Sequence, residues 1–185
     1  MEKIFVGFPK IARLAREIVI SEKIDGTNGC IRIGEDGTFL VGSRTRWLTP
    51  ETGDNHGFLL WAMMHKEELL TLGVGTHFGE WFGAGIQRGY GLQEKRFALF
   101  NTSRWTDNDK RPACCHVVPT LWRGIFNMQE VDNQLNILAK TGSKAAPGYA
   151  KPEGVIIFHT AQGVYFKKTI EKDDACKGII KNDER

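Results

Sequence analysis

The sequence lacks any apolar run that approaches the ~20 residues needed for a membrane-spanning helix. Its first residues also lack the apolar core of a secretory signal. Cysteine is scarce, with 4 in 185 residues, and its positions are too irregular for a disulfide framework in a chain of this length. These absences predict a soluble, cytoplasmic protein without a membrane partner, in which the cysteines are reduced.

A zinc site is also expected to be absent, although Cys114, Cys115 and His116 bring zinc-binding residue types together. Paired zinc ligands are normally separated by a few residues, whereas these cysteines are adjacent and no second ligand pair follows. We expect this segment to be buried and free of metal.

Charge is nearly balanced, with a formal net charge of +3. Such a mild excess permits contact with phosphate backbones without requiring it. Basic residues gather in three groups: Lys10 with Arg13 and Arg16, Arg44 with Arg46, and Lys167 with Lys168. With 41% hydrophobic residues and no internal repeat, the chain can bury one substantial core. We therefore expect a monomer with a single domain over residues 1–185.

Strands and hairpins dominate the predicted structure. Residues 17–22 read as a strand rich in β-branched residues, and Asp36-Gly37 predicts a hairpin with arms at 28–34 and 38–43. A second hairpin is expected around residues 161–163, with arms at 153–159 and 163–168.

Two further strands and two helices complete the prediction. The strands are expected at 75–83 and 96–101, joined by a flexible glycine-rich loop at 83–91. One helix is predicted over residues 58–72, with Leu59, Met63, Leu69 and Leu70 on its apolar side, Trp61 partly buried and His65 at the surface. The other should follow an N-cap at Asn127, with Glu130 three residues later, and end at Gly142. The charged tail at 171–185 should be a helical turn or a frayed end.

The most informative segment is Glu22-Lys23-Ile24-Asp25-Gly26-Thr27-Asn28, which sets a lysine between a strand and a glycine turn. A lysine amine becomes a nucleophile when it loses its proton, and burial or neighbouring cations favour that loss. Lys-x-Asp-Gly is also a common composition for a surface turn. The segments that follow decide between these interpretations.

Five segments follow the lysine in a fixed order, at residues 43–44, 78–83, 97–101, 152–157 and 165–168. Together with the lysine segment, they resemble motifs I, Ia, III, IIIa, IV and V of the covalent nucleotidyltransferases, which include DNA ligases, RNA ligases and mRNA-capping enzymes. The resemblance extends from Glu22 to Lys168. The Glu-Lys-x-x-Gly-Thr-Asn pattern is most similar to ATP-dependent RNA ligases of the phage T4 RNA ligase 2 and RNA-editing types, because capping enzymes usually have arginine where Asn28 stands.

This resemblance implies a fold and an activity. The fold would be the α+β nucleotidyltransferase fold, with antiparallel β-sheets flanked by helices and no OB-fold domain. The activity would be ATP-dependent joining of RNA ends through a covalent lysine-AMP intermediate, in which a 5′-phosphate and a 3′-hydroxyl are sealed. Without an additional domain, the affinity for nucleic acid would be weak or would be supplied by a partner protein.

The resemblance also implies a role for each matching residue. Lys23 would attack the α-phosphate of ATP, and Lys167 or Lys168 would contact that phosphate. Phe100 would stack on adenine, and Glu22 would meet the adenine edge through its backbone. The remaining contacts would involve Asn28 and Arg44 with sugar or phosphate, Glu80 with ribose hydroxyls, and Glu153 with Mg²⁺ or Mn²⁺.

Plainer interpretations of three of these residues stay open. Phe100 could pack in the core, because Phe97 and Leu99 alternate with it along the predicted strand. Glu80 could be a surface carboxylate, and Glu153 could cap the strand that follows it.

Two positions depart from the ligase pattern. The ligases usually have two lysines separated by one residue, whereas Lys167 and Lys168 are adjacent and should point to opposite faces of a strand. We favour Lys167 for the phosphate contact and expect Lys168 to be solvated or to touch nucleic acid. Asn101 stands where many relatives have aspartate, so a charge-dependent role there is in doubt.

Three other functions remain as alternatives. The chain could be an ATP-dependent DNA ligase, a GTP-using capping guanylyltransferase, or an inactive relative that binds nucleic acid ends.

Overall fold

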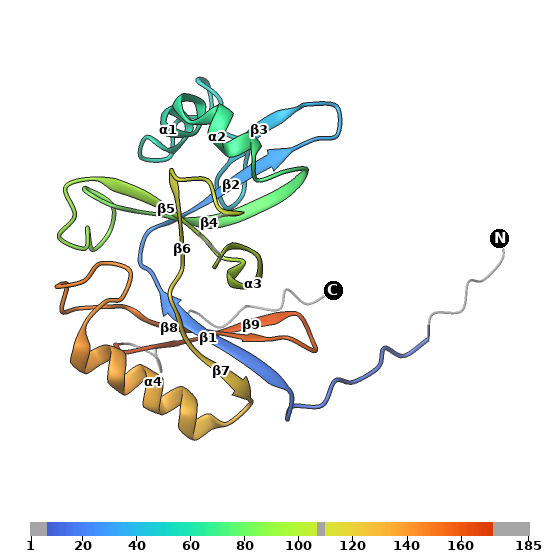
Figure 1. Ribbon diagram of the computed structural model, residues 1–185, viewed down its shortest axis with the longest axis vertical. Coiled ribbons are helices and arrows are strands. Elements are labelled where there is room, and N and C mark those ends of the chain that lie inside the picture. Colours follow the sequence, from blue (N-terminus) through green and yellow to red (C-terminus); the bar gives the residue numbers. More distant parts are fainter. Residues whose placement is uncertain (1–6, 107–109, 172–185) are drawn as a thin grey trace, which may run out of the picture.

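The computed structural model describes residues 7–106 and 110–171 of the chain (Figure 1). Two β-sheets lie one above the other, and helices pack against them, which confirms the predicted α+β fold class. The predicted tail at 171–185 lies outside the described residues except for residue 171. None of the helices in the described ranges has the length and apolar character needed to cross a bilayer.

The first sheet, called sheet A here, has the strand order β7-β1-β8-β9. Its strands are β1 (Glu17–Lys23), β7 (Thr120–Ile125), β8 (Gly154–His159) and β9 (Val164–Thr169). All of its neighbouring strands run antiparallel. The predicted strand at 17–22 and the predicted hairpin at 153–168 are both confirmed, whereas the edge strand β7 was not predicted.

The second sheet, sheet B, has the strand order β3-β2-β4-β5-β6. Its strands are β2 (Thr27–Ile33), β3 (Phe39–Gly42), β4 (Gly75–Gly83), β5 (Lys95–Leu99) and β6 (Cys115–Val117). The hairpin across Asp36-Gly37 is confirmed as β2 and β3. One pair departs from the expected antiparallel sheets: β5 and β6 run parallel, because a long connection returns the chain to the same end of the sheet.

The predicted helix at 58–72 is wrong as a single element. The structure has two short helices, α1 (Phe58–Met64) and α2 (Lys66–Leu70), which are interrupted where His65 adopts a φ of −103° and a ψ of 19°. The break turns each helix so that its own apolar face packs on sheet B. The residues buried in these two helices are Phe58, Ala62 and Leu69, whereas Met63, which was expected inside, is 51% exposed. Trp61 is partly buried as predicted, and the half-buried His65 contacts its ring edge-on.

The helix predicted after Asn127 is confirmed as α4 (Met128–Thr141), which covers one face of sheet A. The Asn127 side chain accepts a hydrogen bond from the backbone N–H of Gln129, and Gly142 ends the helix with a φ of 80°. Val131 and Leu138 are its buried residues. A further short helix, α3 (Thr102–Trp105), was not predicted; Asn101 caps it by accepting from the backbone N–H of Arg104.

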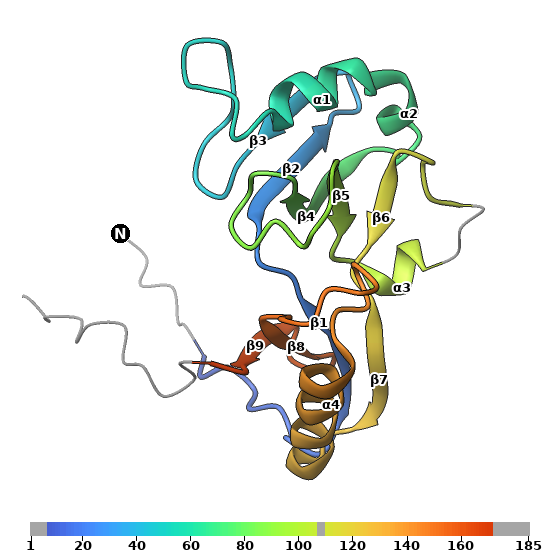
Figure 2. The same cartoon turned by 90° about the vertical axis from the view of Figure 1, so that its left-hand side faces the viewer.

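The two sheets are joined where the chain leaves β1 and enters β2 (Figure 2). An apolar cluster forms at this passage from residues of sheet B and of the connecting loops. Its buried members are Ile24, Phe82, Tyr90, Ala98, Val118 and Ala146. Ile24 directly follows Lys23, so this cluster fixes the position of the lysine segment.

Candidate functional site

Lys23 is the last residue of β1, directly before the connection that leads into β2 and sheet B. Its Nζ donates to Oε2 of Glu153 at 2.5 Å, and both side chains are about four-fifths buried. Strand register explains the contact, because Lys23 pairs with Gly154, the residue after Glu153. The sequence had suggested a cation beside the amine, whereas the described ion pair of Lys23 is with a carboxylate.

Glu80 lies across the passage on β4, opposite Asn28 in the β2–β4 pair. Its two carboxylate oxygens accept hydrogen bonds from the Gly26 N–H at 3.1 Å and from Asn28 Nδ2 at 2.9 Å. The surface-carboxylate interpretation is wrong, because Glu80 is 9% exposed. Burial raises the pKa of Glu80 to about 7, although the Lys23 charge and the two hydrogen bonds oppose the rise.

Gly26 makes this close approach possible. A Cβ added at Gly26 would lie 2.8 Å from Cβ of Phe82 and would overlap the backbone oxygen of Trp81. The Lys-x-Asp-Gly turn therefore requires glycine because of contact with β4, not because of a left-handed backbone conformation.

The glycine-rich connection between β4 and β5 is held against the lysine turn, a relationship that the sequence did not predict. Arg88 donates to Asp25 Oδ2 at 2.9 Å and to the Lys151 carbonyl at 3.2 Å. The Tyr90 hydroxyl accepts from the Asp25 N–H at 2.7 Å, and burial raises the pKa of Tyr90 above its usual value. The prediction of a flexible loop is wrong, because these bonds and the fully buried Ile86 anchor it.

Glu22 points to the opposite face of sheet A from Lys23 and is 1% exposed. Its carboxylate accepts three hydrogen bonds, from Ser143 Oγ at 2.6 Å, Lys144 N at 2.7 Å and Ala145 N at 3.0 Å. Its backbone N–H donates to the Pro119 carbonyl at 2.9 Å. The side chain therefore holds the loop after α4, a role that no feature of the sequence indicated.

Phe100 follows β5 and packs, half-buried, against the apolar cluster that contains Ile24 and Ala98. Phe97 and Leu99 instead lie in the core between sheet B and helices α1 and α2. Since Glu80 pairs with Ala98, the alternation of the strand carries Phe100 toward the side of the sheet that bears Glu80.

The two adjacent lysines of β9 are on opposite faces, as predicted. Lys167 pairs with Ile156 and is exposed on the face that bears Lys23, since both positions follow the same alternation through β8. Lys168 lies on the α4 side, where its Nζ donates to Asp132 Oδ1 at 2.6 Å. Lys168 is thus paired with the helix rather than solvated.

Arg44 is the site candidate that the structure does not bring to this group. It is exposed in the segment after β3, and no described hydrogen bond or ion pair joins it to Lys23, Glu80 or Glu153. The loop between β3 and α1 contacts the start of β2 through Asn55 instead. The Asn55 Nδ2 donates to the Asn28 carbonyl at 3.2 Å, and its Oδ1 accepts from the Thr27 hydroxyl at 3.1 Å.

The described ranges contain no group of three or more acidic, histidine or cysteine side chains that could hold a metal ion. The segment expected to be buried is only partly so: Cys115, which begins β6, is buried, Cys114 before it is half-buried, and His116 is exposed. Glu153 offers a single carboxylate beside Lys23. This donor set fits Mg²⁺ or Mn²⁺ that arrives with a phosphate ligand, because Mg²⁺ favours one or two carboxylates together with substrate phosphates.

Comparison with known proteins also indicates a ligase. The family model described as RNA ligase matches residues 16–181. No curated protein sequence matches with significance.

Among solved structures, a variant of the Naegleria gruberi RNA ligase with ATP and Mn superposes with a TM-score of 0.64 at 19% identity. The alignment covers 84% of this chain and 49% of that one. A second variant with ATP and Mn gives 0.63 at 22% identity, covering 84% and 50%, and the same ligase with PPi gives 0.61 at 19%, also covering 84% and 50%. The chain therefore has the same fold and spans about half the length of these proteins.

Proposed function

Since the chain belongs to the RNA ligase family, we propose that it joins RNA ends with ATP through a covalent AMP adduct on Lys23. The observation that carries the proposal is the meeting of Lys23, Glu153 and Glu80 at the passage between the sheets. These residues come from three separate segments of the sequence. A surface turn would not need a buried carboxylate on one side and an ion-paired carboxylate on the other.

The first reaction step consists of attack by the Lys23 amine on the α-phosphorus of ATP. A P–N bond forms, the bond between the α-phosphorus and its bridging oxygen breaks, pyrophosphate leaves, and the amine gives up a proton. AMP then passes to the 5′-phosphate of an RNA end, and a 3′-hydroxyl attacks that phosphate and expels AMP. The covalent adduct divides one difficult step into easier ones.

Glu153 has two roles in this scheme. In the structure it accepts from Lys23, so the amine must part from this carboxylate before it can attack. Glu153 is also the residue that would hold Mg²⁺ or Mn²⁺; a bound metal of this kind neutralises charge on phosphate groups. The Naegleria gruberi structures with ATP and Mn support this choice of nucleotide and metal.

The remaining residues bind the nucleotide. Phe100 stacks on adenine, a contact worth roughly 1–3 kcal/mol per base. Glu80 accepts from the ribose hydroxyls, and Asn28, which already orients Glu80, contacts sugar or phosphate. Lys167 contacts the α-phosphate from the Lys23 face of sheet A.

The last three residues of the predicted set are Glu22, Arg44 and Lys168. Glu22 contacts the adenine edge through its backbone, while its side chain holds the loop after α4. Arg44 would have to move toward the site when nucleotide is bound. Lys168 serves the reaction through the β9–α4 contact, where it pairs with Asp132.

Parallel incubations with radiolabelled ATP and GTP test this proposal. We expect label from ATP to remain on the denatured protein in the presence of Mg²⁺ or Mn²⁺. Retention of GTP label instead would indicate a capping guanylyltransferase, and retention of neither would indicate an accessory binding module. Sealing of nicked duplexes that differ in which strand is RNA then separates an RNA ligase from a DNA ligase.

A further inference from the structure

Two aromatic rings lie side by side on β8 and the edge strand β9 of sheet A. Phe158 of β8 and Tyr165 of β9 are directly paired in the sheet, with ring centroids 4.6 Å apart and an interplanar angle of 31°. Phe158 is half-buried, whereas Tyr165 is 61% exposed. The phenylalanine therefore supports a tyrosine ring that remains accessible.

Strand register places this pair on the face that bears Lys23. Lys23 is opposite Gly154 of β8, and the next same-face positions along β8 are Ile156, paired with Lys167, and Phe158, paired with Tyr165. Each step of two residues advances about 7 Å along the strand. The exposed Lys167 thus lies between the row of Lys23 and the row of Tyr165.

This order of groups matches the chemistry of a polynucleotide strand, in which anionic phosphates alternate with flat bases. A cation on the same face as the nucleophile complements a phosphate, and an exposed aromatic ring one step further along β9 complements an unpaired base. An acidic side chain in place of Lys167 would repel the phosphates instead.

We propose that Tyr165, backed by Phe158, is a stacking platform for an unpaired base near the 5′-phosphate end of the RNA strand that enters the Lys23 site. This inference rests on the proposed function, and it names the part of the substrate that sheet A holds. The bound strand would run from Lys23 past Lys167 toward β9's first residues.

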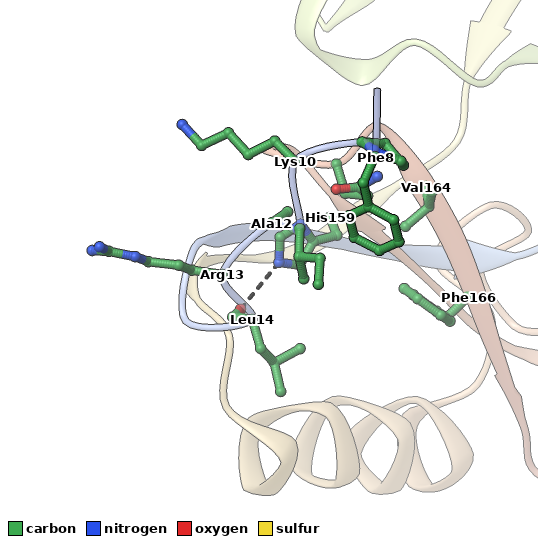
Figure 3. Close-up of a pocket in the computed structure, with 11 residues that line it drawn as sticks. Phe8, Lys10, Ala12, Arg13, Leu14, His159, Val164 and Phe166 are labelled. Atoms are coloured by element: carbon green, nitrogen blue, oxygen red, sulfur yellow. Dashed lines mark hydrogen bonds between the residues drawn. The ribbon is translucent and has the colours of Figure 1, made fainter. Parts of the chain in front are cut away.

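The other face of β9 supplies a matched control. Phe166 is 58% exposed, similar to Tyr165, but it faces away from Lys23. There it lines a cavity of about 410 Å³ together with Val164 of β9 and the N-terminal segment of residues 8–14 (Figure 3). His159 fixes that segment, since its Nε2 lies 3.0 Å from the Leu14 carbonyl oxygen. A base held near Lys23 cannot reach this side of the sheet.

The test uses the full chain and a short single-stranded RNA with a 5′-phosphate and 2-aminopurine near that end. Binding is followed by fluorescence anisotropy, and stacking by quenching of the 2-aminopurine. We expect Tyr165→Ala to weaken binding roughly 5- to 100-fold and to abolish the quenching. Tyr165→Phe should keep both signals, because it keeps the ring, and Phe166→Ala should behave as the wild type.

A separate measurement follows adduct formation with ATP, which Tyr165→Ala should leave unchanged. The inference is overturned if Tyr165→Ala binds RNA as tightly as the wild type, if Phe166→Ala loses as much affinity, or if Tyr165→Ala slows adduct formation as much as it weakens RNA binding. Because RNA binding is measured without ATP, failure of the wild type to form an adduct would count against the proposed function, not against the platform.

Discussion

Lys23 Nζ lies 2.5 Å from Glu153 Oε2, across the β1–β8 pair. Strand pairing produces this contact, because the register that sets Lys23 opposite Gly154 brings the preceding glutamate to the amine. The nucleophile of the proposed reaction is thus held by an anion in the free protein, and the cation Lys167 lies on the same face of the sheet. The predictions below follow from this arrangement.

Glu153→Gln should reduce the rate of adduct formation with ATP roughly 10²–10³-fold, the usual effect of losing one charged or polar stabiliser of the transition state. The amide keeps the size of the side chain but removes the charge that would hold a metal. The rate is measured from incorporation of labelled AMP. Glu94→Gln is the control, because Glu94 is an exposed carboxylate paired with Arg96. Equal rates for both variants would contradict the role of Glu153.

Lys167→Ala should impair adduct formation more strongly than Lys168→Ala. Lys167 shares the face of Lys23, whereas Lys168 is paired with Asp132 on the α4 side. Removing Lys168 should chiefly affect stability, by about 0.2–1 kcal/mol, as expected for a partly exposed ion pair. Labelled-ATP assays and urea unfolding of both variants distinguish these effects. A larger loss of adduct in Lys168→Ala would reverse the assignment of faces.

Glu80 should make the free protein less stable as the pH rises. Burial raises the pKa of this carboxyl to about 7, so the folded state binds a proton more tightly than the unfolded state. Its favourable contribution is complete below the unfolded pKa and is lost as the pH rises through about 7. Relative to Glu80→Gln, the wild type should lose up to about 3 kcal/mol between pH 4 and pH 8, on the scale that links pKa and free energy. Urea unfolding at both pH values measures this difference, and a constant difference would show that Glu80 is not perturbed.

Gly26→Ala should abolish adduct formation and destabilise the fold by about 1–3 kcal/mol, as overpacking does. The added methyl group would meet the backbone of Trp81 and the side chain of Phe82, which would push the lysine turn away from Glu80. Gly37→Asn is the matched control, because nothing lies within 4 Å of a Cβ at Gly37 and asparagine tolerates its φ of 81°. Full activity in Gly26→Ala would show that the close approach to β4 is dispensable.

Local signals in the sequence predicted much of the fold. Asp36-Gly37 marked one hairpin and residues 161–163 the other, because these turns depend on residues within the turn itself. Asn127 and Gly142 likewise marked both ends of α4. By contrast, the break at His65 arises from packing on sheet B, and the three residues of β6 give too short a pattern to recognise.

The candidate site also contains residues that the sequence predicted and contacts that it did not. The motif order predicted Lys23 as the nucleophile, and the structure brings Glu80 and Glu153 to it. Contacts between distant segments could not be predicted, as in the hydrogen bonds from Ser143 to Glu22 and from Arg88 to Asp25. Nothing in the local pattern of a loop shows which buried carboxylate it will meet.

The central claim is that Lys23 forms a covalent bond to AMP. Intact-mass measurement after incubation with ATP and Mg²⁺ or Mn²⁺ tests it directly, with Lys23→Ala as the comparison. The wild type should gain the mass of one adenylyl group, in a linkage that acid cleaves and base does not, as expected for a P–N bond, and peptide mapping should locate it at Lys23. An unmodified wild type, or an adduct that persists in Lys23→Ala, would contradict the account.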